Sequence, residues 1–442
     1  MALTSLSAGD LQTIRALHAA GRSQDALHAC RRLLAAQPDR ADVLAISGTL
    51  ALKLGDVASA EAALRASLAL DASSVEAQFN WGNALMRLGR RADAIAAFER
   101  VLELRPDFVP ALNNLGNALY ESRELQAAAA AFRRALELSP KTAHLQRNLG
   151  TALHGLADLK GALQCFQRAV ALRSDWPKAL QSLATTAMEC GEWRCAAEAC
   201  QSWLRLSAAN VEALGLRSIA LDELGETALA DELLDFERLL RRVQLSIPPA
   251  GFSSLADFNA ALTEQTLAHP TLHLPASNDP RYHCPTLRMT AEFCAGAEGA
   301  SAALGRLVAS AIDDYVEDLA RRLPAHPFVA GGPRRFTLKS WATVLDGEGN
   351  LEPHVHYASY VSAVYYAKIP SAMDHAQSGA GYLELGGGGP ARFPTRVARD
   401  ALAVEPREGL LLLFPSYFYH HTTPFRAPEP RVAIAFDTAP AP

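Results

Sequence analysis

The sequence predicts a multidomain α plus β protein, with an α-solenoid in its first half and an antiparallel β-barrel of the jelly-roll type in its second half. Three observations support this prediction. Residue types recur at a step of 34 in the first half, a Pro- and Gly-rich break follows at residues 246–251, and short β-type segments come after the break. A chain of 442 residues is long enough for two or three domains. We therefore expect the solenoid over residues 1–245 and the barrel over residues 246–442.

The first half repeats its large and small residues every 34 positions. The middle repeats have an aromatic residue or Leu before a Gly, then an Ala, and an aromatic residue four positions after that Ala, and the outer repeats match this pattern less well. In the central repeats these positions are Trp81-Gly82, Leu115-Gly116 and Leu149-Gly150, then Ala94, Ala128 and Ala162, and Phe98, Phe132 and Phe166. Gly and Ala allow two helices to approach closely, and the large residue fills the remaining space. One helical hairpin cannot bury its apolar face alone, so we expect about six or seven hairpins to stack between Leu6 and Leu240.

This pattern resembles the tetratricopeptide repeat. The resemblance implies a superhelix whose concave surface, lined by the first helix of each repeat, binds a peptide or protein partner. Four asparagines are expected on such first helices, where their side chains would hold an extended peptide backbone. They are Asn113, Asn114, Asn117 and Asn148. The alternative is that they are solvated surface residues.

A helix and a series of short strands are predicted after the break. Apolar residues recur at helical spacing over residues 299–322, which predicts one helix flanking the barrel. Short β-type segments, separated by turn-rich ones, cover residues 335–344, 359–367, 381–385, 409–414 and 431–436. Several short strands with Gly and Pro turns indicate a sandwich or barrel. Their connections fit a double-stranded β-helix, the winding of the jelly roll.

Three histidines in the second half have a spacing that suits a metal site. His354 and His356 are two residues apart just before a predicted strand, so on an extended chain both side chains point the same way. His420 follows a distant apolar strand, and Arg431 opens the last one. Non-haem iron is held on one face by two His and usually one carboxylate, with positions left open for other molecules. Imidazole binds as the neutral ring, and an Arg such as Arg431 can bind a carboxylate through two parallel hydrogen bonds.

The stretch from Phe336 to Asp437 resembles a family of 2-oxoglutarate- and iron-dependent oxygenases that are often fused to tetratricopeptide repeats in bacteria. More distantly, it is similar to the prolyl hydroxylases. The matching segments are Lys339-Ser340-Trp341, His354-Val355-His356, Ser362-Ala363-Val364-Tyr365-Tyr366, Gly381-Tyr382-Leu383-Glu384-Leu385-Gly386, Phe414-Pro415-Ser416 and Arg431-Val432-Ala433-Ile434-Ala435-Phe436.

The resemblance implies a dioxygenase, acting as a hydroxylase, that uses Fe(II), 2-oxoglutarate and O2, with no catalytic residue beyond the metal centre. The implied metal ligands are His354, His356 and His420, and the implied 2-oxoglutarate-binding residues are Arg431, Tyr366 and Ser362. Together with the repeats, it makes a captured peptide or protein the expected substrate.

One position departs from the family pattern, which is His-x-Asp or His-x-Glu, because this sequence has His356 at the second position. We favour a three-His iron site. Alternatively, only His354 and His420 bind, with water or a distant acid such as Glu384 completing the site, or the metal is zinc, which three His also suit. Two other functions stay open. One is a three-His metal enzyme that does not use 2-oxoglutarate, and the other is a non-catalytic repeat scaffold with a degenerate barrel.

Composition limits the partners and the compartment. The net charge of −5 argues against a nucleic-acid-binding protein, which usually carries a basic face. Seven cysteines without a CxxC pair indicate neither a disulfide framework nor a structural zinc site, and free thiols fit a reducing cytoplasm. Residues 1–17 lack the pattern of a signal peptide, and no apolar run approaches the roughly 20 residues that span a bilayer. We therefore expect a cytoplasmic protein that binds neither nucleic acid nor membrane.

Overall fold

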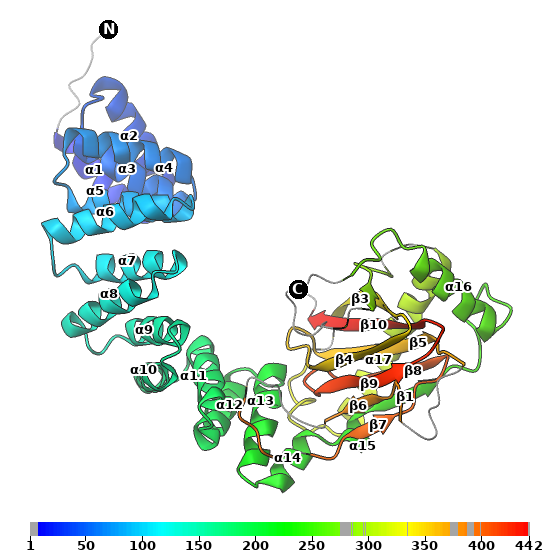
Figure 1. Cartoon of the computed structure of the whole chain (residues 1–442). Helices are drawn as coiled ribbons and strands as arrows, with labels where there is room; N and C mark the ends of the chain where they lie inside the picture. Colours follow the sequence, from blue (N-terminus) through cyan, green and yellow to red (C-terminus); the bar gives the residue numbers. More distant parts are fainter. Residues whose placement is uncertain are drawn as a thin grey trace. The chain divides into compact units, whose positions relative to one another are not determined.

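The computed structural model describes residues 8–274, 284, 286–294, 296, 298–333, 335–371, 379–386, 393–397 and 399–440. The chain forms two compact units, Met1–Ser174 and Asp175–Pro442 (Figure 1). Residues on both sides of the expected domain boundary, 245 and 246, lie in the second unit. Residues 1–7, part of the segment for which no signal peptide is predicted, lie outside the described residues.

The first unit consists of helices that begin at a fixed interval. They are α1 (Ala8–Ala19), α2 (Ser23–Ala36), α3 (Ala41–Leu54), α4 (Val57–Leu70), α5 (Val75–Arg87), α6 (Arg91–Leu104), α7 (Val109–Glu121), α8 (Leu125–Leu138), α9 (Ala143–Gly155) and α10 (Leu159–Leu172). From α3 onward, each first helix of a hairpin begins 34 residues after the previous one. The step continues in the second unit through α11 (Pro177–Glu189), α12 (Trp193–Leu206), α13 (Val211–Glu223) and α14 (Thr227–Leu233). The described residues thus contain seven consecutive helical hairpins.

A contact between Gly and Phe explains the period. In three hairpins the Gly of the first helix lies directly against the Phe of the second. A Cβ atom added at Gly82, Gly116 or Gly150 would lie 2.6, 2.5 or 2.7 Å from the nearest ring atom of Phe98, Phe132 or Phe166, respectively. All three rings are buried. Only a residue without a side chain lets the two helices come this close, which is why the pair recurs together.

The turn inside each hairpin also repeats. A residue with positive φ occurs every 34 residues, at Gly21, Gly55, Gly89, Arg123, Ala157, Gly191 and Gly225. This left-handed conformation suits Gly and costs other residues roughly 1–2 kcal/mol. Arg123 (φ 66°) and Ala157 (φ 62°) therefore hold a conformation that the hairpin geometry imposes on them.

The second unit contains two antiparallel sheets. Their strands are β1 (Arg241–Gln244), β2 (Leu287–Met289), β3 (Phe336–Leu345), β4 (Glu348–His354), β5 (Val361–Lys368), β6 (Leu383–Leu385), β7 (Leu402–Val404), β8 (Leu410–Pro415), β9 (His420–Arg426) and β10 (Arg431–Pro440). Among the described residues one sheet has the order β1-β8-β5-β10-β3-β2 and the other the order β4-β9-β6-β7. From β3 to β10 the chain alternates between the two sheets, apart from the β6–β7 pair. An α-solenoid followed by antiparallel sheets confirms the predicted fold class.

Three further helices belong to the second unit: α15 (Phe236–Leu239), α16 (Leu255–Leu267) and α17 (Gly299–Arg322). The helix α17 covers the residues for which the apolar spacing predicts a flanking helix. Its apolar face is buried at Leu304, Val308, Ile312, Tyr315 and Leu319. The hydroxyl of Tyr315 donates a hydrogen bond to the carbonyl of Leu239 at 2.6 Å, which satisfies a polar atom inside this core.

The last helical hairpin, α13 with α14, packs on the segments that surround the sheets. The hydroxyl of Tyr417 donates to the carbonyl of Leu233 at 2.5 Å. The guanidinium of Arg399 lies 2.5 Å from a carboxylate oxygen of Asp222, and a side chain on Gly215 would meet the ring of Tyr357 at 3.1 Å. These contacts make α13 and α14 part of the second unit rather than a free end of the repeat array.

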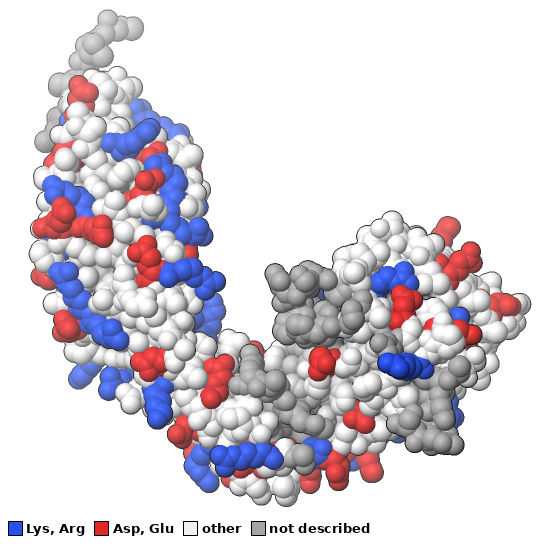
Figure 2. Space-filling view, viewed as in Figure 1, with Lys and Arg blue, Asp and Glu red and all other residues white. Residues whose placement is uncertain are grey.

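Charges of both signs are mixed on one face of the first unit. On the face shown in Figure 2, Lys and Arg side chains are interspersed with Asp and Glu over the helices of the first unit. Ion pairs connect successive hairpins of the first unit, such as Arg91 with Glu121 at 3.0 Å and Arg90 with Glu61 at 3.4 Å. This face is therefore not the basic surface that nucleic acid requires. No helix within the described ranges has the length and apolar character needed to cross a membrane.

Candidate metal centre

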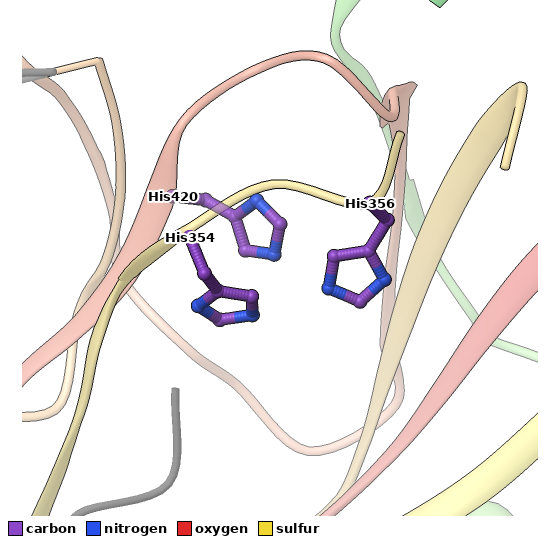
Figure 3. A group of neighbouring side chains, drawn as sticks. All are labelled: His354, His356 and His420. Carbon is purple, nitrogen blue, oxygen red and sulfur yellow. The ribbon is translucent and has the colours of Figure 1, made fainter. Parts of the chain in front are cut away.

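Three histidine rings lie next to one another between the two sheets (Figure 3). His354 ends β4, His356 follows in the loop toward β5, and His420 begins β9. The register of the smaller sheet pairs His354 with His420. One donor nitrogen of each ring lies within 4.8 Å of the other two. The structure thus brings together the three histidines that the sequence predicts as metal ligands.

Two of the rings are oriented by backbone carbonyl groups. The Nδ1 atom of His354 lies 2.7 Å from the carbonyl oxygen of Glu352, and that of His420 lies 2.9 Å from the carbonyl oxygen of Phe418. Because a carbonyl oxygen only accepts hydrogen bonds, Nδ1 carries the proton and Nε2 keeps its lone pair. This is the tautomer with which imidazole binds a metal through Nε2.

The third ring is oriented by side chains. Nδ1 of His356 lies 2.7 Å from Oδ2 of Asp437, and the hydroxyl of Ser362 donates to Oδ1 of the same carboxylate at 2.7 Å. Trp341 stacks on the imidazole, with ring centroids 5.7 Å apart and an interplanar angle of 17°. Nε2 of His356 is buried and has no hydrogen-bond partner among the described residues. A buried lone pair without a partner is costly, so this atom fits a site that is completed by a ligand.

Burial keeps the ring of His420 neutral. Desolvation is the main cause that holds the pKa of His420 well below its ordinary value, and the rings of His354 and His356 lower it further. At neutral pH the ring is therefore already in the form that donates a lone pair.

Arg431 is a buried cation in the same cavity. Its side chain is 4% exposed, and its guanidinium has no carboxylate within ion-pair distance in the described part of the chain. Its Nη1 donates a hydrogen bond to Oγ1 of Thr422 at 3.4 Å. Its Cζ lies 5.2 Å from the centroid of the Tyr366 ring, and burial lowers its pKa. A buried guanidinium without a counter-ion is expensive, so the cavity favours an anion.

The other predicted 2-oxoglutarate-binding residues face the same cavity. Tyr366 is fully buried beside Arg431, and burial raises the pKa of its phenol, with Arg431 partly opposing that shift. Ser362 also lines the cavity, but its hydroxyl is engaged with Asp437. Apolar side chains complete the lining, among them Leu351, Leu383 and Phe414.

The acid considered as an alternative ligand lies elsewhere. Glu384 pairs with His421, with Oε2 and Nε2 3.1 Å apart, and the two residues are opposite each other in the register of β6 and β9. It is not in the group of donor atoms that converge with His354. Within the described residues the geometry therefore favours a set of three imidazoles over a set completed by Glu384.

Sequence reasoning missed Asp437, whose carboxylate contacts the cluster through His356. The signal that could have found it is the alternation of strand side chains. Arg431, Ala433 and Ala435 line the cavity at every second position of β10, and Asp437 is the next residue in that series.

The four predicted partner-binding asparagines lie on first helices, three on α7 and one on α9. Their amides form a row that connects successive hairpins. Nδ2 of Asn114 donates to Asn83 at 2.7 Å, and Nδ2 of Asn148 donates to Asn113 at 3.0 Å and to Asn117 at 3.3 Å. Asn114 and Asn117 line a groove of the first unit together with Thr49, Arg87 and Tyr120, whereas Asn113 and Asn148 are not among the lining residues.

The arrangement suits one divalent metal and one anion. Three imidazoles that converge from one side leave the opposite side of a metal open for other ligands. A buried Arg in the same cavity suits the carboxylate of a molecule that also reaches the metal. Both iron and zinc accept imidazole ligands of this kind.

Comparisons with known proteins match both halves of the chain. Residues 339–437 match the family described as "Putative 2OG-Fe(II) oxygenase". Residues 11–75, 79–143 and 114–179 match the tetratricopeptide repeat. No curated protein sequence matches the chain significantly.

Solved structures of repeat proteins are also similar. One is MamA (residues 41 to the end) from Desulfovibrio magneticus RS-1, at 24% identity and a TM-score of 0.36, covering 38% of this chain and 94% of that one. Another is YrrB, titled a TPR protein with an unusual peptide-binding site, at 22% identity and a TM-score of 0.36, covering 39% and 89%. A third is the C-terminal part of a TPR repeat-containing protein from Cytophaga hutchinsonii, at 12% identity and a TM-score of 0.44, covering 50% and 91%.

The family matches agree with the period of the helices and with the ordered histidines. The chain is therefore a fusion of tetratricopeptide repeats, within residues 11–179, and a domain of the family described as "Putative 2OG-Fe(II) oxygenase", over residues 339–437.

Proposed function

We propose that the protein is a 2-oxoglutarate- and Fe(II)-dependent dioxygenase that hydroxylates a peptide or protein held by the repeats. The observation that carries this proposal is one cavity that contains both three converging imidazoles and the buried guanidinium of Arg431. The first suits a metal with open positions, and the second suits the far carboxylate of a 2-oxo acid. The oxygenase family match supports iron as the metal.

Each residue has a defined task in this proposal. Nε2 atoms of His354, His356 and His420 hold the metal. Bound iron with 2-oxoglutarate would supply the oxidation of a C–H bond by O2, while the co-substrate leaves as succinate and carbon dioxide. Arg431 neutralises and orients the distal carboxylate, and Tyr366 packs beside it. The apolar lining of the cavity limits water near the reacting groups.

The groove on the repeats favours a polypeptide substrate. An Asn amide has two donors and an acceptor oxygen with two lone pairs. The row described above uses only part of that capacity, for example one donor of Asn114 and the oxygen of Asn117. The remaining groups can pair with the N–H and C=O groups of an extended chain.

Two other functions give different results in one assay. The full chain is supplied with Fe(II), O2, 2-oxoglutarate and ascorbate, which is the reductant that turnover without substrate requires, and succinate is quantified. We expect succinate from the wild type and none above background from His354→Ala or His420→Ala. His421→Ala is the matched control, because His421 is adjacent in sequence yet outside the converging group, and it should keep most of the rate. A scaffold, or a zinc enzyme, would form no succinate in any variant.

Substrate capture is tested separately, with peptides selected for turnover from a random peptide library. Asn114→Ala should raise KM for such a peptide about tenfold, as expected for loss of roughly 1.4 kcal/mol of binding. It should leave the succinate rate without peptide unchanged. An unaltered KM would argue that the groove does not hold the substrate.

A further inference from the structure

The carboxylate of Asp437 is held between two strands and one imidazole. Asp437 is opposite Ser362 in the register of β10 and β5. Its Oδ1 accepts the Ser362 hydroxyl, and its Oδ2 lies 2.7 Å from Nδ1 of His356. The side chain is 20% exposed, and no Lys or Arg within the described ranges comes within ion-pair distance of it. His356 is thus the one titratable side chain that this carboxylate contacts there.

The Nδ1 atoms of the other two imidazoles are oriented by a different kind of group. Nδ1 of His354 and Nδ1 of His420 each face a backbone carbonyl, which is neutral. Nδ1 of His356 instead contacts a full negative charge, the carboxylate of Asp437, and the stacked ring of Trp341 fixes the plane of the imidazole. The cluster is therefore asymmetric, although its three donor atoms are alike.

The charge of the three-histidine set differs from that of the usual set of iron ligands. A set of two His and one carboxylate lowers the charge of a divalent metal by one, whereas three neutral imidazoles do not. A carboxylate that accepts the Nδ1 proton of a ligating His makes that ring more basic and fixes its tautomer. The 2.7 Å between Oδ2 of Asp437 and Nδ1 of His356 is a typical length for a hydrogen bond to a charged carboxylate.

We propose that Asp437 is a positioning residue that supplies, through the ring of His356, the negative charge that the three-His set lacks. This inference rests on the proposed function, because it assumes a divalent metal at the three histidines. Asp437 orients His356, raises the electron density at its Nε2 and compensates the charge of the metal without contacting it. His356 stands where related oxygenases have a carboxylate ligand, and the carboxylate of Asp437 lies directly behind the ring of His356.

The test measures metal affinity of the full chain rather than turnover. Co(II), which is less sensitive to O2 than Fe(II), is titrated, and its visible absorption is recorded. Asp437→Asn keeps an oxygen acceptor for Nδ1 and removes the charge, so affinity should fall about 10–100-fold with a shifted Co(II) spectrum. The control is Asp346→Asn, which neutralises a carboxylate paired with Arg288 elsewhere in the same unit. It should change affinity less than threefold.

A double variant separates a positioning role from other roles. If Asp437 acts only through His356, the variant His356→Ala/Asp437→Asn should bind Co(II) as weakly as His356→Ala alone. A further loss in the double variant would overturn the proposal, because Asp437 would then be a ligand itself or a structural residue. Unchanged affinity in Asp437→Asn would also overturn it. If instead the wild type binds no Co(II), or binds it equally well as His354→Ala, the proposed function itself fails.

Discussion

Replacing Arg431 with Met is expected to stabilise the metal-loaded protein without co-substrate and to remove its response to 2-oxoglutarate. Arg431 is buried and lacks a carboxylate partner among the described residues. If Arg431 stabilised the fold, replacing it would lower the stability of the protein. If Arg431 instead serves to bind an anion, its unpaired buried charge lowers the stability of the protein while no anion is bound.

The magnitude follows from the contacts of the guanidinium. Removing an unpaired ion from water costs several kcal/mol. Against this stand the hydrogen bond to Thr422 at 3.4 Å, worth at most about 1 kcal/mol, and the ring of Tyr366, worth about 1–2 kcal/mol. Met fills a similar space without charge. We therefore expect Arg431→Met to gain about 1–3 kcal/mol, which raises the Tm of a unit of this size by about 2–6 °C.

The assay is scanning calorimetry of the full chain with Co(II), with and without 2-oxoglutarate. Co-substrate at 100 times its Kd should stabilise the wild type by about 2.7 kcal/mol and leave the variant unchanged. The control is Arg288→Met, which removes a half-exposed ion pair with Asp346, costs at most about 1 kcal/mol and keeps the response. A variant that loses more than about 2 kcal/mol, or that still responds to 2-oxoglutarate, would refute the reasoning.

Three further predictions concern stability. Ala157→Gly should raise the free energy of unfolding by about 1 kcal/mol, because it relieves the left-handed conformation at φ 62°; the urea midpoint measures it. Gly116→Ala should lower it by about 1–3 kcal/mol, because the added methyl would lie 2.5 Å from the ring of Phe132. Burial holds the pKa of His326 below its ordinary value while Nε2 donates to the carbonyl of Glu232 at 2.7 Å. Its contribution is therefore complete above about pH 6.5 and is lost as pH falls through the folded pKa. His326→Ala should cost more stability at about pH 8 than at about pH 5.5.

Matched variants decide these predictions. Ala127→Gly makes the same change on the exposed face of α8, where it should lower stability by about 0.5–1 kcal/mol. If Ala157→Gly and Ala127→Gly changed the free energy of unfolding in the same direction, the predicted backbone strain at Ala157 would be contradicted. In Gly155→Ala the nearest atom to the added methyl would be the flexible end of Leu125, at 3.1 Å, so this change should cost less stability than Gly116→Ala. A pH-independent difference between His326→Ala and the wild type would show that the ring is not held neutral by the fold.

Features set by local packing could be predicted from the sequence. The period of the repeats is visible because the Gly82–Phe98 contact lies within one hairpin and recurs with it. His354 and His356 were identifiable as a pair because side chains two positions apart on an extended chain point to the same side. The order of His420 and Arg431 after them supplied the rest of the candidate site.

Features that depend on contacts between distant parts of the chain could not be predicted from the sequence. His356 and Asp437 are 81 positions apart, and their contact depends on the pairing of β10 with β5 and on the path of the loop after β4. The strand face of Ser362 follows from alternation, whereas its engagement with Asp437 does not. The row of amides from Asn83 to Asn148 requires the stacking of hairpins, which spacing alone does not describe.

The most direct test of the proposed metal centre is an anaerobic titration of the full chain with Fe(II) and then 2-oxoglutarate, followed by visible absorption. A chelate of iron by the 2-oxo acid end gives a charge-transfer band. We predict a band with one iron per chain that is absent in His354→Ala and weakened in Arg431→Met. Iron binding without a band would contradict the use of 2-oxoglutarate, and no iron binding, or binding that survives His354→Ala, would contradict the three-histidine centre itself.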